Sequence, residues 1–319
     1  MKQAFFLGAG TSINYGVPLT RQFLPYMFEN YLEDKRLIGL KNFLNDFYRQ
    51  NFDMKPPVYP KFEQVLSFLD FAVTEEHSLS AKYDQKYLRQ IRSDFDYLIW
   101  KMMEMATTES YFEGFQKFLQ KTGEDSLFLS VNYDTLLDHT IVEQFGNISY
   151  GIGFSRIFSE LQLQKDVPTP ILLKLHGSIN WLYCPVCESF YCYLGSIEMK
   201  KIFSTKPELC PYDNCYLKGV LISPTWHKNY NLSPISLMWI KASKFLRNIE
   251  RITFIGYSLS DIDMRVNYLL KRSFFDNKNS LEIVVVDPDE KGTVFKRYER
   301  VFGKITGIKQ SFEDYVNSF

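Results

Sequence analysis

The chain has 319 residues, a length that fits one large domain or two of ordinary size. Lysine plus arginine and aspartate plus glutamate are equal at 37 each, so no overall charge attracts nucleic acid or an anionic membrane. Hydrophobic residues make up 45% of the chain, and no apolar run reaches the roughly 18 residues of a membrane helix. We therefore predict a soluble cytoplasmic protein with a sizeable core and no direct nucleic-acid or membrane binding.

The first predicted strand, Lys2–Leu7, leads into a glycine-rich turn at Gly8–Ser12. We expect a helix to begin near Thr11. Glycine lets the backbone approach a pyrophosphate closely, and the first turn of a helix directs free N–H groups at an anion. The turn lacks the third glycine of the usual dinucleotide fingerprint, so a tight turn without a ligand is the alternative.

From about Glu33 to Lys121, apolar residues recur three and four positions apart, which predicts helices. The segment Met54–Lys61 contains three prolines and must interrupt them. We interpret residues 33–121 as a helical insertion that follows the first strand.

Five further apolar segments predict strands, with helical segments between them. They are Ser126–Val131, Pro170–Leu175, Gly219–Ser223, Arg251–Gly256 and Leu281–Val286. Ser233 and Ser260 are plausible N-caps of two of the intervening helices. Asp263 lies in the first turn of the second helix, where a carboxylate favours the helix dipole. This alternation predicts an α/β fold with a doubly wound, parallel, Rossmann-like sheet.

Polar residues follow two of these strands at their carboxyl ends, the edge where an open parallel sheet binds ligands. Asn132 and Asp134 follow the strand at 126–131, and His176 follows the strand at 170–175. Each has an ordinary alternative, as a turn former or a core histidine. Their joint position with the glycine turn predicts a nucleotide-using enzyme.

Two later strand ends add ligand candidates. Gly256 and Ser258, like the glycine turn, follow a predicted strand and could bind a second part of the same ligand. Asp287 could accept hydrogen bonds from a ribose hydroxyl pair, as an acid at a strand end often does. Its alternative is a turn cap before Pro288.

All five cysteines lie between Cys184 and Cys215. Cys184 and Cys187 form a C-P-x-C pair, and Cys210 and Cys215 form a C-x4-C pair. In a reducing compartment these pairs predict a tetrahedral, structural zinc site, whereas ordinary free thiols are the alternative. Cys192 is the spare cysteine and could replace one of the four. We assign residues 181–216 to a zinc-binding module.

Taken in order, these segments resemble the sirtuin family. The turn Gly8–Ser12 and the tripeptide Gly16–Pro18 match the family's G-A-G-x-S turn before G-[IV]-P, and Arg21 falls on its arginine. Ser130–Asp134 is similar to the family's T-Q-N-x-D segment, and His176-Gly177 to its catalytic H-G. The four cysteines follow where sirtuins carry zinc. The resemblance implies an NAD-binding domain of residues 1–32, 122–180 and 217–319.

The sequence analysis thus yields three sets of predicted site residues. The predicted catalytic residues are Asn132, Asp134 and His176, the predicted cofactor-binding residues are Gly8, Ala9, Gly10, Ser12, Arg21, Ser130, Gly256, Ser258 and Asp287, and the predicted metal ligands are Cys184, Cys187, Cys210 and Cys215.

Departures from the family pattern bear on the reaction. Leu19-Thr20 stand where sirtuins that deacylate lysine carry Asp-Phe, and Val131 replaces the Gln of T-Q-N-x-D. The loss of that phenylalanine favours attack by water over transfer to an acyl-lysine. No acyl-peptide groove is evident at Leu221–Tyr230. These features resemble divergent prokaryotic sirtuin-like proteins that hydrolyse NAD as phage-defence effectors.

The resemblance implies hydrolysis of the nicotinamide–ribose bond, with NAD as substrate and a zinc ion that has a structural role only. Asn132 would position the water or a ribose hydroxyl, His176 would act as the base, and Asp134 would orient the nicotinamide or the sugar. An NAD-dependent lysine deacylase and a non-catalytic subunit that senses NAD or ADP-ribose remain alternatives.

A free NAD hydrolase would harm its host, so we expect a gate on the activity. The insertion at 33–121 is the candidate for that gate, or for a contact between copies in a homo-oligomer. The resemblance also suggests a partner ATPase or a nucleic-acid-guided defence protein.

Overall fold

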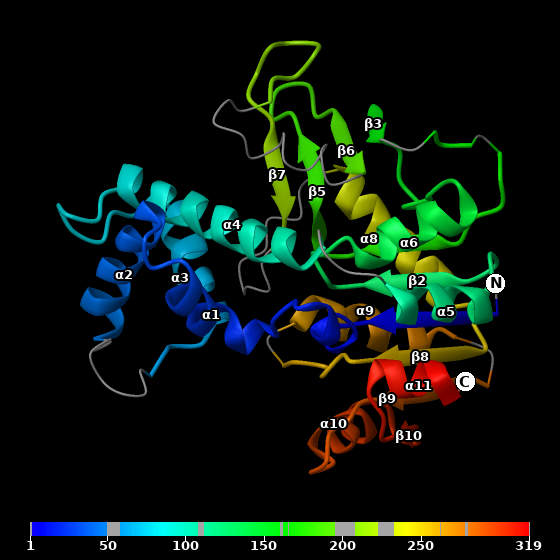
Figure 1. Ribbon diagram of the computed structural model, residues 1–319. Coiled ribbons are helices and arrows are strands. Elements are labelled where there is room, and N and C mark those ends of the chain that lie inside the picture. The colour runs from blue at the N-terminus through cyan, green and yellow to red at the C-terminus, as the bar shows by residue number, and fades with distance from the viewer. Residues whose placement is uncertain are drawn as a thin grey trace.

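The computed structural model describes most of the chain, and a six-stranded parallel sheet forms its centre (Figure 1). The described residues are 2–49, 58–107, 112–159, 162–164, 166–194, 208–222, 233–261, 263–277 and 280–318. The strands of the sheet are β1 (Gln3–Leu7), β2 (Leu127–Ser130), β4 (Ile171–Lys174), β8 (Arg251–Ile255), β9 (Glu282–Val286) and β10 (Thr306–Ile308).

The strand order is β10-β9-β8-β1-β2-β4, and every neighbouring pair is parallel. The chain first runs outward from β1 through β2 to β4, and then returns to the other side of β1 to place β8, β9 and β10. This is the order of a doubly wound, dinucleotide-binding sheet, whose topological switch point lies between β1 and β8. The predicted fold class is therefore confirmed.

Both faces of the sheet are covered, as consecutive residues of β1 demonstrate. The Phe5 ring contacts Phe118 of α5 (Glu113–Thr122), with ring centroids 5.1 Å apart. The Phe6 ring contacts Phe254 of β8 at 5.3 Å, and Phe254 packs against Tyr298 of α10 (Thr293–Phe302).

The helices form two groups, one on each face. The first group is α5, α6 (Leu136–Phe145) and α11 (Phe312–Ser318), and the second includes α8 (Ser233–Leu246), α9 (Met264–Phe275) and α10. Right-handed crossovers require this division, because the chain winds in opposite directions along the two halves of the sheet.

A helical bundle lies beside the sheet (Figure 1). Its helices are α1 (Phe23–Asn30), α2 (Lys35–Tyr48), α3 (Phe62–Thr74) and α4 (Gln85–Thr107). Arg92 of α4 forms ion pairs with Asp70 of α3 and with Asp96 of its own helix. The helix α1 precedes the predicted insertion at 33–121, and α5 lies within it but packs on the sheet, so the bundle begins and ends earlier than predicted. The predicted domain boundaries otherwise stay a prediction.

A second, smaller sheet has the order β3-β6-β5-β7. Its strands are β3 (Arg156–Ser159), β5 (Gly177–Tyr183), β6 (Phe190–Leu194) and β7 (Lys218–Leu221). The predicted strand Gly219–Ser223 therefore corresponds to β7 at the edge of this sheet, and its expected place in the parallel sheet was wrong. Only Leu175 and His176 separate β4 from β5, too few for the crossover that another parallel strand requires, so β5 leaves the parallel sheet. β7 pairs antiparallel with β5 and therefore belongs to the same small sheet.

The expectation of a helix beginning near Thr11 was also wrong. The chain there forms short 3-10 turns at Ala9–Thr11, Ile13–Tyr15 and Thr20–Gln22, and the first α-helix begins at Phe23. Gly16 ends the second turn in the left-handed region, with φ of 82°, and Pro18 cannot donate a helical hydrogen bond. The glycine turn therefore has no α-helical amino terminus behind it.

Two segments that the sequence singled out lie outside the described residues. They are residues 54–57 of the proline-rich segment and residues 223–230 of the segment that begins at Leu221. Among the described residues, no helix is long and apolar enough to cross a membrane. The cytoplasmic location stays a prediction.

The contact between Gly10 and Gly256 gives a test of the fold. A Cβ on Gly10 would lie 2.6 Å from the Gly256 Cα, so the two turns would have to separate. We expect Gly10→Ala to lower the free energy of unfolding by about 1–3 kcal/mol, the range of an overpacked core. Urea denaturation followed by circular dichroism measures this.

Gly153→Ala is the matched control, because a Cβ at Gly153 meets nothing within 4 Å. Its effect is expected to stay within about 0.5 kcal/mol. Equal losses in the two variants would contradict the close approach of the turns.

Candidate active site

The carboxyl ends of five strands form one registered row. Leu7 of β1 pairs with Ser130 of β2 on one side and with Ile255 of β8 on the other. Ser130 pairs in turn with Lys174 of β4, and Ile255 pairs with Val286 of β9. The residues that directly follow this row are Gly8, Val131, Leu175, Gly256 and Asp287. All the strand-end segments predicted as ligand sites therefore begin at the same sheet edge.

Asn132 reaches from the loop after β2 to the glycine turn after β1. Its Nδ2 donates to Gly8 O at 3.0 Å, and lies 3.2 Å from both Thr11 Oγ1 and Ser12 Oγ. Because a backbone carbonyl can only accept, the contact with Gly8 fixes which end of the amide faces the turn. The other end, Oδ1, is the atom of Asn132 that could accept a hydrogen bond from a water or a ribose hydroxyl.

Asp134 is held against the same turn. Its Oδ2 accepts a hydrogen bond from Ser12 Oγ at 2.9 Å, and its Oδ1 accepts one from the Leu136 N–H at 3.2 Å. Burial raises the pKa of this carboxyl, while the nearby Lys174 and the Ser12 hydroxyl oppose the rise. In this structure Asp134 fixes the glycine turn, and its predicted contact with nicotinamide or sugar stays a prediction.

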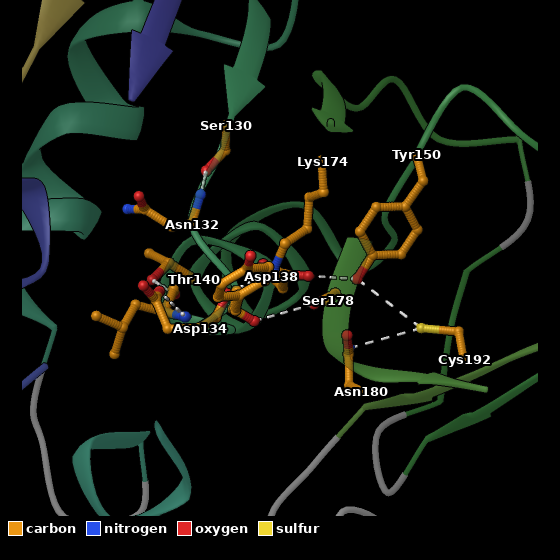
Figure 2. A network of polar contacts seen from close by, with 12 residues as sticks. Ser130, Asn132, Asp134, Asp138, Thr140, Tyr150, Lys174, Ser178, Asn180 and Cys192 are labelled. Carbon is orange, nitrogen blue, oxygen red and sulfur yellow. Dashed lines mark hydrogen bonds and ion pairs between the residues drawn. The ribbon is translucent and has the colours of Figure 1, made fainter. Parts of the chain in front are cut away.

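A buried polar network underlies the loop that carries Asn132 and Asp134 (Figure 2). The Lys174 ammonium donates to the backbone carbonyl of Asp134 and lies 3.0 Å from Asp138 Oδ2. The side chains of Lys174 and Asp138 are each 1% exposed. The Tyr150 hydroxyl donates to Asp138 Oδ1 at 2.6 Å, and its burial raises its pKa well above the usual range. The network joins β4, α6 and the loop after β2.

His176 lies on the two-residue connection between β4 and β5 and pairs with Asp263. The His176 Nε2 is 3.3 Å from Asp263 Oδ2, and the two side chains are 4% and 6% exposed. The Tyr257 hydroxyl also donates to Asp263 Oδ2, at 3.3 Å. Our sequence reasoning placed Asp263 only in the first turn of a helix. Its position in the segment after β8 was the signal that could have assigned it to the site.

Three other predicted cofactor residues have less defined places. Arg21 is exposed on the 3-10 turn Thr20–Gln22, and Ser258 is exposed on the loop after β8. The Asp287 Oδ1 accepts a hydrogen bond from the Asp289 N–H at 3.0 Å, and burial raises the pKa of Asp287. The turn cap that was the alternative for Asp287 is therefore present, and contacts of these three residues with a ligand stay predictions.

The cysteine module contains a group of atoms that could hold a metal ion. The sulfurs of Cys184, Cys187 and Cys210 and a carboxylate oxygen of Asp213 all lie within 4.8 Å of one another. Three thiolates and one carboxylate are ligands that zinc accepts in tetrahedral sites. Cys215 is not part of this group, and its Sγ lies 3.6 Å from the Tyr216 carbonyl oxygen. The sequence analysis missed Asp213, although it lies within the C-x4-C segment.

Cys192 belongs to the buried network rather than to this metal-binding group. Its Sγ lies 3.8 Å from the Tyr150 hydroxyl and 3.7 Å from Asn180 Nδ2 (Figure 2). It is fully buried on β6. Its replacement of one of the four predicted ligands therefore finds no support in this arrangement.

No protein-family model matches the chain, and no curated protein matches it. Among solved structures, one similar protein is Sir2Tm bound to a propionylated peptide, with a TM-score of 0.47 and 12% identity over 99% of this chain and 90% of that chain. Another is SIR2 in complex with the inhibitor EX-527, 2'-O-acetyl-ADP-ribose and deacetylated p53 peptide, with a TM-score of 0.44 and 12% identity over 99% and 91%. At this level of similarity, the fold is assigned by the strand order and register of the chain itself.

Removing the charge of Lys174 tests the buried network. Lys174→Met leaves the Asp138 carboxylate buried without its cation, and we expect a loss of about 3–5 kcal/mol in the free energy of unfolding. The double variant Lys174→Met/Asp138→Asn removes both charges, so it is expected to recover part of that loss. Denaturant unfolding of the three proteins measures the effect, and a double variant less stable than Lys174→Met would contradict the pairing.

The ligand set of the metal-binding group can be tested by comparing two neighbouring variants. We expect one zinc per chain, and we expect Asp213→Ala to weaken its retention more than Cys215→Ser, because Asp213 lies within the group. Elemental analysis measures the zinc content of each protein, and competition with a chromogenic chelator measures how tightly the zinc is retained. Release of zinc by Cys215→Ser, with retention in Asp213→Ala, would instead support four thiolate ligands.

Proposed function

We propose that this protein hydrolyses the nicotinamide–ribose bond of NAD and releases nicotinamide and ADP-ribose. The observation that carries the proposal is the meeting of the glycine turn, Asn132 and His176 at one sheet edge, beside the switch point. Doubly wound sheets bind dinucleotides at this place. The sequence resemblance to sirtuins at the same residues supports NAD as the dinucleotide.

The glycine turn supports binding of the pyrophosphate. The backbone amides of Gly8, Gly10, Thr11 and Ser12 already donate to carbonyls of the protein. In the described part of the chain, the Ala9 amide has no such acceptor. The Ala9 N–H would therefore donate to a phosphate oxygen, while the missing side chains of Gly8 and Gly10 let this turn pack against Gly256.

The reaction does not need a general acid, because the nicotinamide ring nitrogen already carries a positive charge. It becomes neutral when it takes the electron pair of the bond to ribose. The protein must hold the sugar, stabilise an oxocarbenium-like centre and admit water. A bond forms between the water oxygen and the anomeric carbon as the bond to nicotinamide breaks. Asn132 Oδ1 would hold that water or a ribose hydroxyl, and His176 would take the proton.

The departures in the sequence favour water over an acyl-lysine as the nucleophile. Thr20 is a small, half-buried residue on the 3-10 turn Thr20–Gln22, where the deacylase pattern has a bulky phenylalanine. A small side chain at this position would leave the reactive face of the sugar open to water. The same feature argues against the deacylase alternative.

We extend the proposal to a regulated role in antiphage defence. The bundle α1–α4 is not needed for a nucleotide-binding sheet, so it is the candidate for a gate or for contacts between copies in an oligomer. A partner ATPase or a nucleic-acid-guided protein is the kind of partner that the sequence resemblance suggests. Depletion of cellular NAD on phage infection, with His176→Ala as the inactive control, tests this role.

Nicotinamide release from NAD tests the reaction directly. The wild-type protein, in its activating condition, is expected to release nicotinamide without any peptide present. Asn132→Ala is expected to lower the rate about a hundredfold or more, the size of effect seen when a preorganised polar group is lost. Chromatography measures nicotinamide, and calorimetry measures NAD binding, since Asn132 also contacts the glycine turn. Asn317→Ala, an exposed change on α11 outside the bundle and the ligand edge, is the control.

The same assay separates the alternatives. If release requires an acetyl-lysine peptide and yields an acylated ADP-ribose, the protein is a deacylase. If NAD binds and neither reaction occurs with any partner or in any oligomeric state, it is a sensing subunit.

A further inference from the structure

The pair formed by His176 and Asp263 spans the two halves of the main sheet. His176 follows β4, which is the last strand on one side, and Asp263 follows β8 on the other side of the switch point. The strands β1 and β2 lie between them in the sheet. The segment after β8 therefore reaches across the ligand edge to place a carboxylate on this imidazole.

The carboxylate of Asp263 is itself held firmly. Asp263 caps α9, with its N–H donating to Ser260 O and its own carbonyl accepting from the Asn267 N–H, both at 3.1 Å. The Tyr257 hydroxyl donates to Oδ2, and the Tyr257 ring packs on Phe6 of β1 with centroids 4.7 Å apart. A buried carboxylate with a defined backbone and two polar contacts is suited to orient a partner.

The imidazole of His176 lies near two aromatic rings. The Tyr133 ring centroid is 6.3 Å away and the Trp239 ring centroid is 6.5 Å away. Both rings are anchored, because the Tyr133 hydroxyl donates to Ile222 O at 2.7 Å and the Trp239 Nε1 donates to Leu175 O at 3.1 Å. Aromatic neighbours restrict the ring plane of His176, and the Asp263 carboxylate lies against its Nε2.

We infer that Asp263 is the positioning residue of His176 and fixes both its ring orientation and its tautomer. A carboxylate that accepts from Nε2 keeps the proton on that nitrogen, so Nδ1 is the basic nitrogen of the neutral imidazole. Nδ1 then receives the proton from water or a ribose hydroxyl. This inference rests on the proposed function, in which His176 is the base.

The tautomer can be measured without any turnover. The chain has four histidines, so the ring nitrogens of His176 can be assigned in long-range proton–nitrogen spectra by comparison with His176→Ala. The wild-type protein is expected to show the Nε2–H form, and Asp263→Ala a mixture of the two tautomers. Asp261→Asn, an exposed acid two residues earlier, is the control and is expected to leave the spectrum unchanged. An unchanged tautomer in Asp263→Ala would overturn the inference.

Kinetics supplies the second test. Asp263→Ala is expected to lower kcat for nicotinamide release about 10–100-fold with little change in KM, the size of effect typical of groups that orient a reacting side chain. Asp263→Asn retains an acceptor and is expected to lose less. In the His176→Ala background, Asp263→Ala is expected to have no further effect, because residues that act as a unit are not additive. An additive loss would assign Asp263 an independent role and overturn the inference.

The two measurements separate failure of this inference from failure of the proposed function. If the protein shows a fixed Nε2–H tautomer but does not hydrolyse NAD, the positioning role of Asp263 is supported and the proposed reaction is contradicted. If Asp263→Ala does not fold, the isosteric Asp263→Asn carries both tests, and a partial shift from the Nε2–H tautomer with a smaller loss of kcat is the expected result.

Discussion

The close approach of two glycine turns at the switch point is the constraint on which the site depends. Gly10 donates its N–H to Gly256 O at 2.9 Å, and Gly256 adopts a φ of 61°, which side chains rarely tolerate. A Cβ on Gly8, Gly10 or Gly256 would meet backbone at 2.6 Å. The contact holds the ends of β1 and β8 together, and the hydrogen bonds of Asn132 and of Ser12 with Asp134 are built on the turn that it positions.

Two buried polar pairs lie near this edge. Lys174 is neutralised by Asp138, and His176 is paired with Asp263, each across elements that are distant in sequence. Burial would make the isolated charges costly, so the pairs also fix the loops that carry them.

The short connection between β4 and β5 couples the two sheets. His176 lies in that connection, and Cys184 directly follows β5 at its far end. A metal held by the cysteine group would fix the end of the strand that begins next to His176. The cysteine module, which has no predicted part in the chemistry, would thus help to hold His176 in place.

The sequence by itself determined the α/β class, five of the six strands of the main sheet, and the polar residues at their ends, because apolar runs and strand-end residues are local patterns. It did not predict β10 or most of the small sheet. It placed a helix at Thr11, where the left-handed conformation of Gly16 ends a short 3-10 turn. It also assigned β7 to the wrong sheet, because the two-residue connection after β4 sends β5, the pairing partner of β7, into the small sheet. The partnership of Asp263 with His176, and that of Asp213 with three cysteines, depend on contacts between distant segments, which only the tertiary structure decides.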